Sequence, residues 1–279
     1  MPDEKLPISP DKRALKSWLR GRSIHTEKAY RQDMESFLSA AGKTLSEITI
    51  EDVQEWYADL AGAEASKRRK LAAVKSCMKF CVENRFIDHN PAAAVRPAKV
   101  QEDLHERILS REDVMRMIDL EKDPRRHAVL RTLYIMGLRN SELSGMKWKD
   151  LTRRKQGATV SIFGKGGKTR HVQATASLLK EWEDLREGRD PEAPVLCASV
   201  GGPLTHDAVG RIVARAAKRA GIAAKVTPHW LRHACASHAL DRGANVHVVQ
   251  ATLGHASLST TTRYAHVQEG DGAGSWLED

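Results

Sequence analysis

Hydrophobic residues in the first hundred positions recur at the spacing of amphipathic helices. Thr26 and Glu27 mark the start of the first of these helices. Asn90-Pro91 and Arg96-Pro97 end the region, because proline and the residue before it disfavour a continuing helix. The pattern predicts an all-helical N-terminal domain over residues 10–97. Its three apolar stripes are Tyr30, Met34, Phe37 and Leu38; Val53, Trp56, Tyr57 and Leu60; and Leu71, Val74, Met78, Cys81 and Val82.

A different pattern follows a polar stretch over residues 98–108, which we interpret as a linker. Ser110 and Asp113 resemble a capping box and begin a second domain over residues 109–268. Apolar and polar residues alternate on both sides of the turn Gly164–Gly167, which predicts a β-hairpin. The fold class is therefore mainly α, with one small antiparallel sheet. Further helices are expected at 124–136, 140–147, 175–187, 206–220, 230–242 and 245–253.

Composition adds a preference for a polyanionic partner. The 279 residues include 45 Lys and Arg against 36 Asp and Glu, which gives a net charge of +9. No apolar run approaches the roughly 20 residues that a membrane span needs, and the N-terminus lacks the apolar core of a secretory signal. Cys77 and Cys81 share one helix face and are expected to be core thiols in a reducing compartment. A cytoplasmic, nucleoid-associated protein is the expectation.

Four short segments carry the candidate chemistry. They are Gly137–Leu143, Gly164–Arg170, His229–His233 and Leu253–His255, and Tyr264 follows nine residues after the last of them. Each alone has an ordinary explanation, such as a salt-bridged arginine, a solvated lysine or a packed tyrosine. The His-x-x-Arg-His segment could bind a metal ion, but no cluster of cysteine or carboxylate ligands accompanies it. No metal and no cofactor are therefore expected.

In this order, the segments resemble the tyrosine recombinase (phage integrase-like) family, and within it the short Xer-like members. That family has an arginine in a G-L-R-x-S-E-L segment, a lysine in a β-hairpin, an H-x-L-R-H segment, an L-G-H segment and a nucleophilic tyrosine. Residues Thr26–Asp33 are also similar to the family's N-terminal helical domain, which binds the core of the DNA site. The resemblance covers nearly the whole chain.

The resemblance implies a site-specific DNA recombinase that works through a 3′-phosphotyrosine. Phosphoryl transfer builds negative charge on the phosphate oxygens, which arginines can hold in bidentate fashion. A lysine in the hairpin can protonate the departing 5′ oxygen, and nearby cations favour the phenolate of a tyrosine. Glu142, three residues after Arg139, is expected to orient that arginine. The implied catalytic residues are Arg139, Lys165, His229, Arg232, His255 and Tyr264, with the histidines as hydrogen-bond donors and His229 also a candidate base.

Basic residues outside this set are candidates for contact with the DNA backbone. The run Arg153–Lys155 is one such candidate, and a solvated surface is the competing interpretation for each run. The partner implied is duplex DNA carrying a specific recombination site, bound by a homo-tetramer or by a hetero-tetramer with a second recombinase. The candidate DNA-binding residues are Lys67, Arg68, Arg69, Lys70, Lys168 and Arg170.

Two alternatives and one terminal segment remain open. A type IB topoisomerase would share the chemistry but relax DNA as a monomer, and a DNA-binding regulator could retain the fold without the chemistry. Residues 269–279 are expected to form a flexible C-terminal tail that contains Trp276 and Leu277. These apolar residues either pack on their own domain or fray, or they dock on a neighbouring protomer as in the resembled family.

Overall fold

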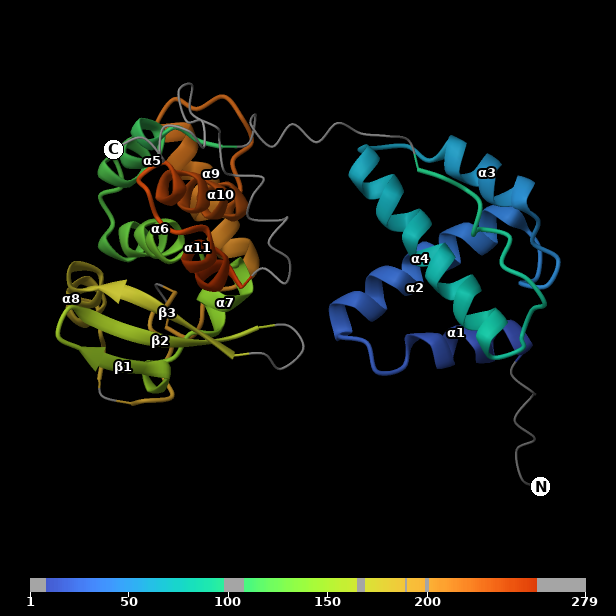
Figure 1. Ribbon diagram of the computed structural model, residues 1–279, viewed down its shortest axis with the longest axis horizontal. Helices are drawn as coiled ribbons and strands as arrows, with labels where there is room; N and C mark the ends of the chain where they lie inside the picture. The colour runs from blue at the N-terminus through green and yellow to red at the C-terminus, as the bar shows by residue number, and fades with distance from the viewer. Residues whose placement is uncertain (1–8, 98–107, 165–168, 189, 199–200, 255–279) are drawn as a thin grey trace, which may run out of the picture. The chain divides into compact units, whose positions relative to one another are not determined.

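The computed structural model describes residues 9–97, 108–164, 169–188, 190–198 and 201–254 (Figure 1). The chain divides into two compact units, residues 1–102 and 103–279. Among the described residues, no helix is long and apolar enough to cross a membrane.

The first unit is built from helices whose apolar faces meet in one core. Ser9, Ser23 and Thr49 each accept a backbone N–H at the start of a helix, which satisfies one of the donors left free there. Phe37 and Trp56 pack edge to face, with ring centroids 4.9 Å apart. The predicted stripes are confirmed as core-facing. The helices are α1 (Pro10–Leu19), α2 (Ile24–Ala41), α3 (Ile50–Asp59) and α4 (Glu64–Glu83).

Helix α1 was not predicted, and α2 begins at Ile24, two residues before the expected start. α1 buries Trp18 and Leu19 against the same core as α4. Its stripe is short and lies among charged residues, so its period is weak in the sequence. Cys77 and Cys81 are buried free thiols, as expected.

The second unit combines helices with a three-stranded antiparallel sheet, so the predicted fold class is confirmed. Helices α6 and α8 lie against one face of the sheet (Figure 1). Its elements are α5 (Arg111–Asp119), α6 (Pro124–Met136), α7 (Asn140–Gly145), η2 (Trp148–Asp150), β1 (Leu151–Arg154), β2 (Gly157–Phe163), β3 (Thr169–Thr175), α8 (Ala176–Asp184), α9 (His206–Arg219), α10 (Pro228–Leu240) and α11 (Val246–Leu253).

The sheet has the order β1-β2-β3, and the predicted hairpin is its β2–β3 pair. Val160 pairs with Val172, and Ala158 pairs with Ala174, so these apolar side chains share the buried face. Strand β1 was not predicted. Its sequence Leu-Thr-Arg-Arg has only one apolar residue, and the strand exists because its backbone pairs with β2.

Close packing brings the ends of α6 and α11 together against the middle of α10. Gly137 ends α6 with φ +58°, a conformation that favours glycine. A Cβ atom there would lie 2.7 Å from Leu253 Cδ2 and 3.1 Å from Cys235 Sγ. The backbone that leaves α6 toward Arg139 therefore runs directly against α10 and α11.

Candidate active site

Arg139 occupies the N-cap position of α7, where the chain turns after Gly137. Its backbone N–H donates to Glu142 Oε2 at 2.8 Å, and its Nη1 donates to Glu142 Oε1 at 2.8 Å. The Arg139 side chain is 41% exposed. Glu142 therefore fixes this arginine by both its backbone and its guanidinium, as the sequence predicted, and leaves the group accessible to a ligand.

The Glu142 carboxylate is the buried centre of a cluster of arginines. Its side chain is 3% exposed and also lies 3.9 Å from Arg232 Nη1. Burial raises the pKa of Glu142, but hydrogen bonds from Arg170 and from the Arg139 backbone outweigh burial and lower the pKa to about 2. The carboxylate is therefore charged at neutral pH and holds positive groups close together.

Arg232 lies at the bottom of this cluster, with a side chain that is 2% exposed. Its Nη1 donates to the Gly137 carbonyl at 2.6 Å, and its Nη2 donates to the Leu253 carbonyl at 2.5 Å. These bonds use the carbonyls at the ends of α6 and α11, which lack partners within their helices. A permanent, buried positive charge is thereby held near the same carboxylate that orients Arg139.

His229 borders the same region from the first turn of α10. It lines a cavity of about 350 Å³ together with Arg139, Asn140 and His206. The rings of His229 and His233 meet edge to face, with centroids 4.3 Å apart. The structure thus brings together three of the sequence-predicted residues, Arg139, His229 and Arg232.

Asn140 and His206 were not singled out from the sequence. Asn140 Nδ2 donates to the His206 carbonyl at 3.0 Å, which ties the start of α7 to the start of α9. Asn140 lies inside the predicted Gly137–Leu143 segment. His206 lies 66 residues after Asn140, directly behind the threonine that caps α9. No sequence signal connects Asn140 with His206.

Arg170 has a different place from the one expected. Its side chain is 13% exposed and makes a bidentate ion pair with Glu142 at 2.6 and 2.7 Å, so it belongs to the buried cluster. The expected role in phosphate contact does not fit this position. Lys165, Lys168, His255 and Tyr264 lie outside the described residues.

Comparison with known proteins matches both units to one family. The phage integrase family matches residues 107–270, and the phage integrase N-terminal SAM-like domain matches residues 17–84. The chain belongs to the phage integrase family. The tyrosine recombinase XerC of Xylella fastidiosa strain M23 is 33% identical over 262 residues, which cover 89% of this chain and 88% of the relative.

Two further comparisons concern the family and the fold. XerD of Rhizobium meliloti strain 1021 is 33% identical over 274 residues, covering 90% of this chain and 87% of the relative. The XerH site-specific recombinase, crystallised in a post-cleavage complex with palindromic difH substrate, shares the fold with a TM-score of 0.71. That match has 22% identity and covers 90% of this chain and 78% of XerH.

In the first unit of the recombinase, the basic run on α4 is partly engaged within the protein. Arg69 makes a bidentate ion pair with Asp33, which is 3% exposed, and Lys67 Nζ lies 3.3 Å from Glu64 Oε1. Arg69 is therefore committed to holding α4 against α2. Arg68 is exposed and Lys70 is half-buried.

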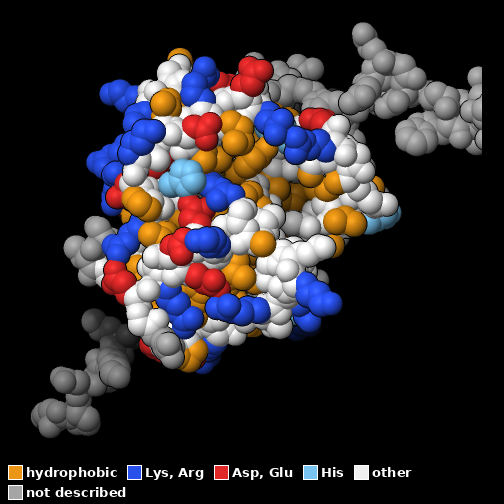
Figure 2. All heavy atoms as spheres, turned by 90° about the vertical axis from the view of Figure 1, so that its left-hand side faces the viewer, with side chains coloured by type: hydrophobic (Ala, Val, Ile, Leu, Met, Phe, Trp, Pro, Cys, Tyr) orange, Lys and Arg blue, Asp and Glu red, His pale blue; other side chains and the backbone are white. Residues whose placement is uncertain are grey.

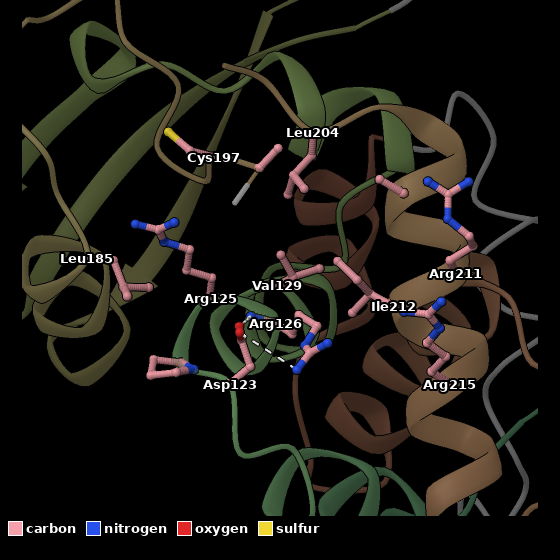
Figure 3. Close-up of a pocket in the computed structure, with 13 residues that line it drawn as sticks. Asp123, Arg125, Arg126, Val129, Leu185, Cys197, Leu204, Arg211, Ile212 and Arg215 are labelled. Atoms are coloured by element: carbon pink, nitrogen blue, oxygen red, sulfur yellow. Dashed lines mark hydrogen bonds and ion pairs between the residues drawn. The ribbon is translucent and has the colours of Figure 1, made fainter. Parts of the chain in front are cut away.

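A second cavity of the recombinase, of about 420 Å³, lies between α6, α9 and the loop after α8. Figure 2 shows a hollow on the face of this unit with apolar side chains inside it and basic ones at its margin. Arg125 and Arg126 border the cavity from α6, and Arg211 and Arg215 border it from successive turns of α9 (Figure 3). Arg211 and Arg215 have no ion-pair partner among the described residues. Its apolar lining includes Val129, Leu185, Leu204 and Ile212.

Proposed function

We propose that this recombinase cuts and rejoins duplex DNA at a specific site through a covalent bond to Tyr264. The tyrosine oxygen attacks the scissile phosphorus, the bond to the 5′ oxygen breaks, and a 3′-phosphotyrosine forms. A 5′-hydroxyl from a partner strand then attacks the phosphotyrosine and releases the tyrosine. Each step replaces one phosphoester bond by another, so no external energy source is needed.

The roles follow from charge and position. Arg139 and Arg232 hold the non-bridging phosphate oxygens, where negative charge grows in the transition state. His229 and His255 donate hydrogen bonds to the same group, with His229 also able to accept the tyrosine proton. Lys165 gives a proton to the departing 5′ oxygen. Glu142 orients Arg139.

One observation carries this proposal. Arg139 and Arg232 come from segments about ninety residues apart, yet both contact the same buried carboxylate, that of Glu142, and His229 lines the cavity with Arg139. A protein that only binds DNA has no need for such a cluster of buried charge, which is costly to desolvate. The arrangement supports phosphoryl transfer. The test is to incubate the protein with a DNA substrate nicked beside the cleavage position and to look for a covalent adduct at Tyr264.

Two assays separate the alternatives. A type IB topoisomerase would relax supercoiled plasmid that lacks a specific site, whereas a site-specific recombinase requires that site. A regulator that retains only the fold would form no covalent complex on a suicide substrate nicked beside the cleavage position. We propose a location in the cytoplasm at the nucleoid, where the DNA substrate lies.

We expect cleavage to survive removal of divalent metal ions. The positive charge that phosphoryl transfer needs is assigned to Arg139, Arg232 and Lys165, so a metal ion has no step to perform. The rates of covalent-complex formation with and without EDTA should differ by less than about threefold. Loss of a metal ion that acts as a Lewis acid would cost several kcal/mol of transition-state stabilisation and would slow the reaction far more than that. A strict requirement of adduct formation for Mg²⁺ would contradict these roles.

We further propose that the active assembly is a tetramer on DNA, because exchange of strands between two duplexes requires four cleavages. The second cavity is a candidate contact between protomers. Residues 269–279, which lie outside the described residues, combine Trp276 and Leu277 with four acidic residues. That combination complements an apolar cavity bordered by four arginines.

Deletion of residues 270–279 should therefore weaken cooperative binding to paired half-sites. An aromatic anchor contributes about 2 kcal/mol to an interface, which corresponds to a roughly 30-fold loss of cooperativity. The double substitution Arg211→Glu and Arg215→Glu should give a similar loss with the tail intact. Lys218→Glu, on the same helix but outside the cavity lining, is the matched control. Unchanged cooperativity in the truncated protein would contradict an assembly role for the tail. Gel-shift titrations on one and two half-sites measure these effects.

A further inference from the structure

The guanidinium of Arg170, on β3, donates three hydrogen bonds within the protein. Nη1 and Nη2 donate to the two carboxylate oxygens of Glu142 at 2.6 and 2.7 Å, and Nε donates to the Thr252 carbonyl at 2.8 Å. The side chain also lies across Gly254, where a Cβ atom would come within 2.9 Å of Arg170 Cδ. Three of its five N–H donors are therefore committed, and little of it faces solvent.

The contact with Thr252 is one of a series at the end of α11. Three consecutive carbonyls accept from three arginines: Thr252 from Arg170 at 2.8 Å, Leu253 from Arg232 at 2.5 Å and Gly254 from Arg139 at 3.4 Å. Carbonyls at a helix C-terminus lack intrahelical partners and carry partial negative charge. The same guanidiniums that surround Glu142 thus also fix the backbone immediately before His255.

The charges of this cluster show why a third arginine matters. Three guanidiniums, those of Arg139, Arg170 and Arg232, face the one carboxylate of Glu142. Arg170 makes the most complete ion pair with it, and the charge of Arg170 alone balances that of the carboxylate. Without Arg170, Glu142 would draw on these two arginines alone and compete with the phosphate for them.

We propose that Arg170 is a positioning residue for DNA cleavage. Its charge balances that of Glu142, which leaves Arg139 available to the phosphate, and its hydrogen bond to Thr252 holds the end of α11 at the phosphate site. This inference rests on the proposed function. It replaces the interpretation of Arg170 as a phosphate contact and makes a different prediction. A phosphate contact contributes to DNA affinity and to its salt dependence, whereas a positioning residue acts on the rate of cleavage after DNA is bound.

The test compares DNA binding and cleavage in Arg170→Gln. We expect the rate of covalent-complex formation on a nicked suicide substrate, with all DNA bound, to fall about 100-fold, as when one stabilising donor is misplaced. The dissociation constant for a single site should change by less than about threefold, with an unchanged slope against salt concentration. Arg170→Lys keeps the charge but cannot make all three contacts, and it should recover part of the rate. Arg116→Gln is the matched control, because Arg116 is an exposed arginine of the same unit that pairs with Asp113 on its own helix, α5.

Two outcomes would overturn the inference. In the first, Arg170→Gln forms the covalent complex at the rate of the parent protein and binds DNA equally well. In the second, it forms the complex at the parent rate once all DNA is bound, but it binds DNA more weakly and its salt slope is reduced by about one, as for a lost phosphate contact. If thermal melting shows that Arg170→Gln does not fold, Arg170→Lys decides by the same two measurements. Absence of any adduct in the parent protein would refute the proposed function instead, so the two failures are distinguishable.

Discussion

Tyr264→Phe should form no covalent adduct with DNA. The substitution removes only the hydroxyl, which is the proposed nucleophile, and no other group can replace the missing oxygen. It removes little binding surface, so the affinity for the recombination site should stay within about twofold of the parent, as for a surface change of less than 0.5 kcal/mol. Denaturing gel electrophoresis with a nicked, labelled substrate measures the adduct, and a gel shift measures binding.

Tyr134 provides the matched control. It lies in the same unit, its hydroxyl is 3.0 Å from His238 Nδ1, and burial raises the pKa of its phenol. Tyr134→Phe loses one hydrogen bond, worth about 1 kcal/mol of folding stability, and should still form the adduct. A denaturant-stable adduct with Tyr264→Phe, or its loss in folded Tyr134→Phe, would show that the nucleophile is assigned wrongly.

Apart from α1, the α-helices were predictable because their apolar residues repeat at the period of the structure. The stripe from Leu71 to Cys81 becomes the buried face of α4, and alternation around residues 158–174 gives the β2–β3 hairpin. Strand β1 escaped prediction because its stability comes from backbone pairing with β2 and not from its own side chains. Local sequence contains no signal for a partner strand of that kind.

Three residues of the site were predicted from the sequence, but the contacts between them were not. The order of segments places Arg139, His229 and Arg232 in one site, and the structure brings these three together. In contrast, Arg170 seemed a phosphate contact because it follows a glycine-rich basic turn. Its carboxylate partner is 28 residues away in the chain, so only the fold reveals the pairing.

Arg69 gives a second example of the same limit. A run of four basic residues on a helix is typical of a DNA-contacting surface, yet the fold pairs Arg69 with a buried aspartate 36 residues earlier. A buried carboxylate needs a cation, and the nearest one on the facing helix supplies it. Within the run, exposed Arg68 therefore remains the better candidate for contact with a phosphate.

The proton donor to the departing 5′ oxygen can be assigned by a substrate with a sulfur atom at that bridging position. Lys165 and Lys168 both follow β2 and precede β3 in the chain. Loss of the true general acid should slow cleavage of normal DNA by about 10²–10⁴-fold. A thiolate leaves without protonation because a thiol has a pKa near 8.5, far below that of an alcohol. The sulfur substrate should therefore restore cleavage only where the missing group is the acid.

We expect the sulfur substrate to restore cleavage by Lys165→Ala to within about tenfold of the parent, since only the proton transfer was lost. Lys168→Ala should instead bind DNA more weakly, with a salt slope reduced by about one and no specific gain from sulfur. Single-turnover cleavage of both substrates by both variants gives four rates, and their ratios cancel differences in binding. Restoration of Lys168→Ala alone would move the acid to Lys168. Restoration of neither would show that the proton comes from outside residues 165–168, and the charge of Lys165 would then act on the phosphate itself.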